Sequence, residues 1–579
     1  MKSTIKTYLS LRHITMFVSL FLLLAMHAPA DLFTPYLWAE DGVVLISGAI
    51  YNGIKALFIP GNGAYWVIQK LLAWLCYLVV LPFNSITALP YLQQIAAKAL
   101  ATLSILYFTS EKFSWVLKDT IQRFFVCVAI VLLFPKACDV VTCETSLPFY
   151  FVFPVFLIGL DVLCSPKAAL PSVPQTIFMS LFALSSAAAP FVLLIVVAAA
   201  IRAAIVHRTT LLARPKTALL IDAAKIAVIC IAVWLQLSTV LSSERTNTNL
   251  ELLRRAWLTT KYFLFIPYLH GLHGHPSWVV WLIGLVAWLC AWKVVKVPCI
   301  VLLYSGAFSW GYVLLCSMVG TAHDFYSYDT LASRYGFACY EIAAFVMALA
   351  IVTLLNAKTR LRSMGIVAAF LLLITALRHY DIPLVGAEFA AAYKQNSPLF
   401  DRKGTDRVFI PIGPWSLWEM SIPASISDKD FIDDIEFLVE TTNGAVIGSE
   451  NYGKLDFRAG SSGIVNLSGW ARTGVANQTF SKLLVKSPVS GAYRPATFLR
   501  VRSDFHGEPI QHNGFTFMLP KEYFSAGTSV LEVYGKTADG AWHHGSYQLV
   551  TELLGTPALA LEDDLDAVFE SAEDIDEAL

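Results

Sequence analysis

An acidic pair stands just after the first apolar stretch of the chain, in the segment Trp38-Ala-Glu-Asp-Gly42. The stretch covers residues 14–30, so Glu40 and Asp41 lie close to the end of a predicted membrane helix. Carboxylates are costly near hydrocarbon and are seldom placed there without a partner or a function. A carboxylate can take the proton from an attacking hydroxyl group, although helix capping and solvation are the ordinary alternatives. The pair predicts acid–base chemistry at a membrane surface.

Positively charged side chains that suit phosphate oxygens lie in two later loops. Arg334 and Tyr335 come just before an apolar stretch over 336–356, and Arg254 and Arg255 are adjacent in an earlier polar segment. A guanidinium group presents planar donors that match phosphate oxygens. Anchoring at the membrane interface is the competing interpretation. We name these four residues as candidate phosphate-binding residues.

A second set of acid and imidazole side chains is a candidate for a further acid or for metal ligands. His323 and Asp324 are adjacent in the same loop as Arg334, and Glu144 lies in the polar segment 136–147. An imidazole next to a carboxylate can bind a metal or orient a hydroxyl group. Three further histidines lie close together, but their spacing fixes no ligand geometry: His270, His273 and His275.

Membrane helices are the elements that must position these residues. The chain has 579 residues, of which 56% are hydrophobic, and its mean hydropathy is +0.61. These values exceed those of soluble enzymes of this length. Apolar runs of about 17–25 residues, enough to cross a bilayer, predict about eleven or twelve spans up to residue 378. The spans are 14–30, 65–81, 89–109, 121–135, 148–163, 175–187, 189–205, 218–241, 277–296, 298–318, 336–356 and 363–378.

Charge divides the chain into two parts and gives an orientation. Residues 1–378 contain 27 Lys and Arg against 14 Asp and Glu, and residues 379–579 contain 15 against 28. Basic loops such as 202–216 are expected in the cytoplasm, which places everything after 379 outside. Counting from the N-terminus also places 31–64 outside. The two counts disagree between 65 and 148, and a re-entrant or missed segment would reconcile them.

The part after residue 378 is expected to be extramembrane. Residues 379–430 contain several prolines and are interpreted as a connector, whereas 431–556 alternate apolar and polar residues between turns. This alternation predicts an antiparallel β-sandwich. Residues 557–579 form an acidic tail. All ten cysteines lie before residue 379 and show no disulfide framework or zinc spacing.

Three short segments resemble those of bacterial GT-C glycosyltransferases. They are Trp38-Ala-Glu-Asp-Gly42, Phe58-Ile-Pro-Gly-Asn-Gly-Ala-Tyr65 and Ser333-Arg-Tyr335. These polytopic enzymes transfer a sugar from a polyprenyl-phosphate donor on the outer face of the membrane, and they include phage-type glucosyltransferases that modify O-antigen. The resemblance covers roughly residues 1–378 and is more specific for the fold than for the substrate.

The resemblance implies a function and a place for it. Asp41 or Glu40 would be the catalytic base, and glucose or another hexose would pass from polyprenyl phosphate to a cell-envelope glycan such as O-antigen in lipopolysaccharide. The protein would lie in the bacterial inner membrane with a periplasmic C-terminal domain. A divalent metal, Mg or Mn, is compatible with this chemistry but not required. Expected partners are the lipid-linked donor, the glycan acceptor and membrane lipids, with no nucleic acid.

Two other functions compete with this interpretation. A transporter or flippase of a lipid-linked glycan would use similar basic sites without catalysis. Such a protein usually places ionisable residues within its spans, whereas the clear acidic residues here lie mostly in loops. A scaffold protein whose β-domain binds partners gives no reason for the acidic pair.

Overall fold

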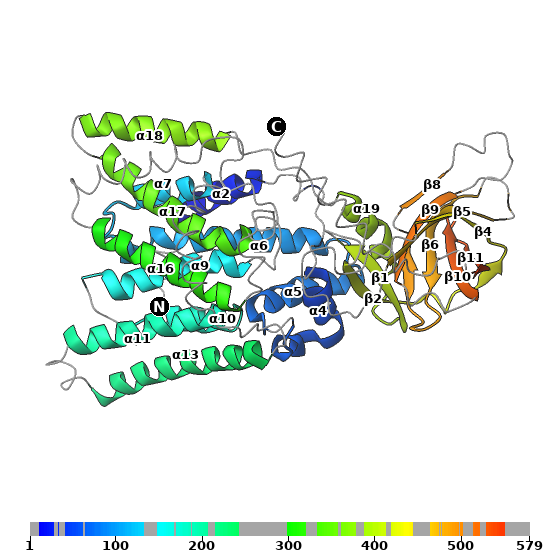
Figure 1. Ribbon diagram of the computed structural model, residues 1–579, viewed down its shortest axis with the longest axis horizontal. Coiled ribbons are helices and arrows are strands. Elements are labelled where there is room, and N and C mark those ends of the chain that lie inside the picture. Colours follow the sequence, from blue (N-terminus) through cyan, green and yellow to red (C-terminus); the bar gives the residue numbers. More distant parts are fainter. Residues whose placement is uncertain are drawn as a thin grey trace, which may run out of the picture. The chain divides into compact units, whose positions relative to one another are not determined.

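The structure is a computed structural model, and its described residues form two compact units (Figure 1). The first unit comprises Met1–Leu81 and Ala88–Ala387, and the second comprises Pro82–Thr87 and Glu388–Leu579. The described residues are 11–27, 33, 37, 41–61, 64–132, 147–166, 170–186, 188–206, 215–242, 298–319, 333–356, 360–377, 387–412, 418–443, 464–473, 475, 478–496, 498–501, 513–520 and 528–550.

The first unit is helical. Four of its described helical stretches are long and apolar enough to cross a membrane, namely Asp41–Phe58, Leu147–Cys164, Ala189–Val206 and Lys216–Val240, and six apolar helices are shorter. A multi-pass membrane protein is therefore supported. The elements are α2 (Leu11–His27), η1 (Asp41–Ile46), α4 (Ser47–Asn52), η2 (Gly53–Phe58), α5 (Val67–Val80), η3 (Leu81–Phe83), α6 (Leu89–Leu106), η4 (Tyr107–Thr109), η5 (Glu111–Phe113), α7 (Thr120–Leu132), α9 (Leu147–Cys164), α10 (Val173–Ala183), α11 (Ala189–Val206), α13 (Lys216–Ser242), α16 (Pro298–Val319), α17 (Ser333–Leu355) and α18 (Arg360–Leu377).

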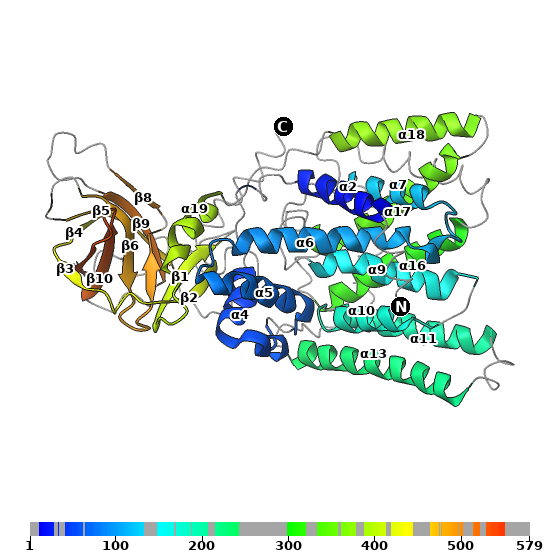
Figure 2. The same ribbon diagram turned by 180° about the vertical axis from the view of Figure 1, so that it is seen from behind.

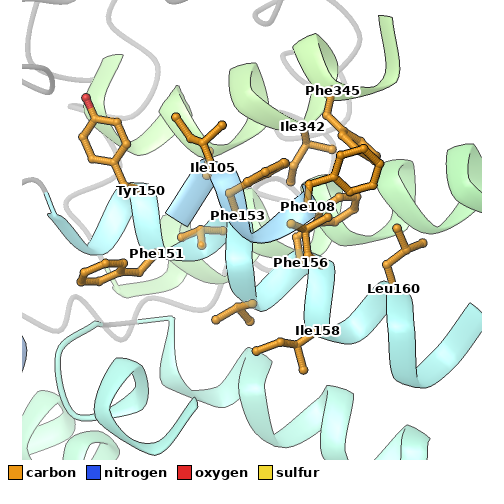
Figure 3. Close-up of a cluster of buried hydrophobic side chains, with 14 of the residues drawn as sticks. Ile105, Phe108, Tyr150, Phe151, Phe153, Phe156, Ile158, Leu160, Ile342 and Phe345 are labelled. Atoms are coloured by element: carbon orange, nitrogen blue, oxygen red, sulfur yellow. The ribbon is translucent and has the colours of Figure 1, made fainter. Parts of the chain in front are cut away.

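Helix α9 lies at the centre of the helical unit, in contact with α6, α11, α16 and α17. Its aromatic side chains pack edge to face against Phe345 of α17, with ring centroids 5.7 Å away for Phe153 and 5.6 Å away for Phe156 (Figure 3). A Cβ on Gly159 would lie 1.9 Å from the hydroxyl of Tyr304, so glycine is what lets α16 approach. In a bilayer such packing stabilises the bundle through van der Waals contact.

One end of the helical unit, which we call the basic end, is defined by polar contacts between connections. Arg12 at the start of α2 lies 3.9 Å from Asp119, which precedes α7. Lys112 donates to Ser172, just before α10, over 3.4 Å. Arg202 near the end of α11 donates to backbone carbonyls at the end of α9. The segment 107–119 therefore lies at the same end of the helical unit as the start of α2.

Helix α5 begins away from the basic end. The backbone N–H of Tyr65, just before α5, donates to Oε1 of Gln236 over 3.2 Å. Gln236 lies 11 residues after Lys225 in α13, about 16 Å along the helix axis, and Lys225 donates to the carbonyl of Pro171 beside the basic end. Figure 2 shows α5 continuing beyond the end of α10, where the N–H of Val67 donates to the carbonyl of Leu184.

The connection between α5 and α6 belongs to the second unit. The hydroxyl of Tyr393 donates to the carbonyl of Ile86 over 2.6 Å, and Oγ1 of Thr87 lies 3.0 Å from Oγ of Ser397. Within the expected span 65–81 the described helix is the 14-residue α5.

The second unit contains two sheets that share a hydrophobic core drawn from β5, β6, β9 and β10. The seven-stranded sheet has the order β2-β1-β7-β6-β10-β11-β3, and the four-stranded sheet has the order β4-β5-β9-β8. The elements are α19 (Ala387–Asn396), η8 (Ser397–Leu399), β1 (Asp406–Ile412), β2 (Trp418–Ala424), β3 (Phe431–Asp433), β4 (Glu436–Asn443), β5 (Ile464–Arg472), β6 (Phe480–Lys486), β7 (Tyr493–Pro495), β8 (Phe498–Val501), β9 (Asn513–Pro520), β10 (Thr528–Thr537) and β11 (Trp542–Val550).

Two features of this unit differ from the expectation. Strands β1 and β7 pair in parallel, as do β3 and β11, so the larger sheet is mixed rather than antiparallel. The segment 379–430 is only partly a connector, because β1 and β2 within it join the larger sheet. The acidic tail over 557–579 lies outside the described residues.

Candidate active site in the first loop

The first loop folds into helical turns that begin at Asp41. Its side chain is only 2% exposed. The π-helix η1 continues through α4 into the 3-10 helix η2, and all three pack along α5. Oγ of Ser47 donates to the carbonyl of Gly42 over 2.9 Å and supports the widened turn. Because π-turns occur frequently at functional sites and buried carboxylates are costly, Asp41 is the strongest described candidate for a functional acid.

A tight turn at Gly61 brings the loop back toward α5. Gly61 and Ala64 exchange backbone hydrogen bonds of 2.8 and 3.0 Å. A Cβ on Gly61 would lie 2.7 Å from Cγ1 of Val44 and 3.7 Å from Nζ of Lys70. The bare glycine therefore lets η1, the turn and α5 converge.

Side chains from distant helices hold the start of α5. Besides the bond from Tyr65 to Gln236, the N–H of Ile68 donates to Oγ of Ser185 over 2.9 Å. Nε2 of Gln69 donates to the carbonyl of Ser185 over 3.4 Å. The first loop thus ends on a fixed point of the helical bundle.

Lys70 is the second buried charge of this region and was missed by the sequence reasoning. Its side chain is 3% exposed, and Nζ donates to the carbonyl of Ile59. Lys70 is the single charged residue of the predicted span 65–81. That isolation was the available indication, since ionisable residues in apolar helices are usually functional.

Known proteins give no similar case. No family model, curated protein or solved structure matches this chain. The chemistry of the first loop therefore follows from its own residues. A buried carboxylate can accept a proton, a buried ammonium can hold an anion, and both are costly in an apolar bundle without such a use.

Polar groups are also buried deeper in the helical unit. Nζ of Lys98 donates to Oε1 of Gln94 over 2.9 Å, and both side chains are buried in α6. Glu341 in α17 is fully buried, and neither carboxylate oxygen has a hydrogen-bond partner within the described part of the chain. Ionisable side chains therefore lie buried within helices as well as in loops.

Most of the predicted site residues are not brought together by described contacts. Arg334 and Tyr335 belong to the first turn of α17, and their side chains are not among the described ones. Among the described residues, no three His, Cys, Asp or Glu side chains gather closely enough to hold a metal ion. The other predicted residues lie outside the described part of the chain: Glu40, Glu144, Arg254, Arg255, His270, His273, His275, His323 and Asp324.

Proposed function

We propose that the protein is a membrane glycosyltransferase of the GT-C type. It transfers glucose or another hexose from a polyprenyl-phosphate donor to a cell-envelope glycan such as O-antigen. The observation that carries this proposal is Asp41, a carboxylate buried at the start of a helical loop that packs along α5. The absence of water around a buried base strengthens its electrostatic interactions with a substrate.

The proposed reaction is a displacement at the anomeric carbon. Asp41 accepts the proton of the acceptor hydroxyl as its oxygen forms a bond to that carbon. The bond from the anomeric carbon to the phosphate oxygen breaks, and the lipid phosphate leaves with the electron pair. Glu40 is the alternative base, and Arg334 with Tyr335 at the start of α17 is assigned to the departing phosphate.

The location is part of the same proposal. The basic end faces the cytoplasm of a bacterial inner membrane, and the first loop faces the periplasm. The C-terminal unit then lies in the periplasm. In this arrangement the C-terminal unit assists in holding the glycan acceptor.

Linkage analysis of envelope polysaccharide tests this function. The strains are a deletion, the deletion restored with wild type, and the deletion restored with an equally expressed Asp41→Ala, Glu40→Ala double variant. We expect a sugar branch to vanish in the deletion and to return only with wild type. Full restoration by the double variant would show that these acids are not catalytic.

Buried charge within helices favours a second candidate, a transporter or flippase of a lipid-linked glycan. Lys98 and Glu341 are enclosed in α6 and α17, as expected for a substrate or proton path. Proteoliposomes without an acceptor distinguish the two functions. Translocation of a labelled polyprenyl-phosphate hexose in that assay supports the transporter, and acceptor-dependent release of polyprenyl phosphate supports the transferase.

A further inference from the structure

Lys70 differs from the two buried arginines of the described chain in its partners. Lys70 is 3% exposed. Its Nζ has one hydrogen-bond partner in the described chain, the neutral carbonyl of Ile59. Arg123 is equally enclosed but meets Glu111 at 2.8 Å, and Arg494 meets Glu419 at 2.6 Å. In both of those cases a carboxylate balances the charge.

An ammonium group in this state is energetically incomplete. It carries three donors, and one carbonyl accepts only one of them. A buried charge that lacks an opposite charge costs several kcal/mol in general, so natural proteins pair it or use it. The observation therefore points to an anion that the described residues do not supply.

The surroundings of Lys70 fit an anion brought by the substrate. A Cβ on Gly61 would lie 3.7 Å from Nζ of Lys70. Because Gly61 has no side chain, the side of the turn that faces the ammonium group is unobstructed at this position. Asp41 stands one turn before Val44 on η1, the segment that meets Gly61 and packs along α5. The ammonium and the candidate base thus belong to segments in direct contact.

The proposed chemistry indicates which anion this is. The anion that the proposed reaction brings next to the candidate base is the phosphate of the lipid-linked donor. An ammonium group is a compact point charge that binds phosphate well.

We propose that Lys70 binds the phosphate of a lipid-linked substrate, next to the first-loop acid. This inference rests on the proposed function, in which that phosphate is the leaving group. As the bond to the anomeric carbon breaks, negative charge grows on the phosphate oxygen, and a preorganised buried cation stabilises it there. Lys70 then acts in addition to Arg334.

Binding of polyprenyl phosphate to the full-length protein in nanodiscs of zwitterionic lipid is the test. Lys70→Gln removes the charge but keeps an N–H donor for Ile59, and Lys70→Met removes both. We expect each variant to bind polyprenyl phosphate about tenfold or more weakly than wild type. The matched control is Lys55→Gln, because Lys55 is exposed in the same loop, and it should bind within about twofold of wild type.

Stability without ligand separates a binding role from a structural one. If Lys70 serves only the fold, both variants should melt earlier than wild type. If it awaits an anion, Lys70→Met should melt at the same temperature or higher, because a buried unpaired charge has been removed. Unchanged polyprenyl-phosphate affinity in both variants would overturn the inference.

Two further ligands identify the source of the phosphate. Nanodiscs with phosphatidylglycerol test for a general lipid headgroup site, and inorganic phosphate tests for a general anion site. Equal, Lys70-dependent affinity for either would overturn the assignment to a lipid-linked substrate. Lys70-dependent binding of polyprenyl phosphate without any sugar transfer would refute the transferase and leave this site standing. Transfer that is undiminished in Lys70→Gln would refute this site alone.

Discussion

The backbone N–H of Tyr65 donates to Oε1 of Gln236 over 3.2 Å, although 171 residues separate the two positions in the sequence. Gln236 is fully buried in α13. The bond sets the depth at which the first loop ends and α5 begins. The position of Lys70, and of the loop that starts at Asp41, depends on this one long-range contact and on those from Ser185.

Replacement of Gln236 tests that dependence. Gln236→Leu keeps a similar volume but removes the acceptor, so the N–H of Tyr65 loses its partner at a cost of about 1–3 kcal/mol. We expect faster backbone hydrogen exchange over residues 64–70 and weaker sugar transfer. The control is Ser238→Ala, an exposed position on the same helix. Unchanged exchange over 64–70 would contradict the anchoring role.

Asp41→Asn tests the candidate base with little change in shape. Because the amide cannot accept the proton of the acceptor hydroxyl, we expect kcat to fall by about 10²–10⁴-fold. Binding of the donor should change far less, since the proton transfer occurs only in the transition state. Kinetics with purified protein and Glu40→Gln as a parallel variant show which acid acts. A loss confined to Glu40→Gln would move the base to Glu40.

Much of the architecture was predictable because membrane helices and β-strands have recognisable local sequence patterns, long apolar runs and alternation of apolar and polar residues. Long apolar runs predicted helices that the structure shows to be long and apolar enough to cross a membrane, at Leu147–Cys164, Ala189–Val206 and Lys216–Val240. Asp41 was found from its place after the first apolar stretch. Lys70 was not, because a single lysine in an apolar run resembles an ordinary interruption. Gln236 was hidden by its distance in sequence from the loop that it holds.

Strands β1 and β2 were missed because each contains a proline, which argues against a strand. Pro423 lies in β2, at the edge of the larger sheet, where a missing N–H is tolerated. Pro411 lies beyond Val408, the one residue through which β1 pairs with β7.

Substitution of Gly61 tests whether the close approach of η1, the turn and α5 is needed for function. Gly61→Ala places a Cβ 2.7 Å from Cγ1 of Val44, and so η1 must move away from the turn. We expect a loss of sugar transfer together with a lower melting temperature. Gly306→Ala is the control, because a Cβ there meets nothing within 4 Å and alanine favours the helix α16. Equal effects of both substitutions would argue against a specific role of the turn.

His544 makes the stability of the C-terminal unit depend on pH. Its Nδ1 lies 2.8 Å from Oδ1 of Asp433, and its Nε2 bonds to Glu532. Burial lowers the pKa of His544, but the hydrogen bonds and charges of Glu532 and Asp433 outweigh burial and raise this pKa above its ordinary value. His544 can donate to both carboxylates, and so join β11 to both β3 and β10, only while its imidazole is protonated.

The sign of the pH effect follows from that raised pKa. The stabilisation is fully present below the unfolded pKa of about 6.5 and is lost as the pH rises through the higher folded value. Hydrogen exchange of β10 and β11, corrected for its intrinsic pH dependence, should show stronger protection at pH 6 than at pH 8.5. His544→Gln should remove most of this difference, and Glu532→Gln should reduce it. A pH dependence that survives in His544→Gln would assign the effect to another group.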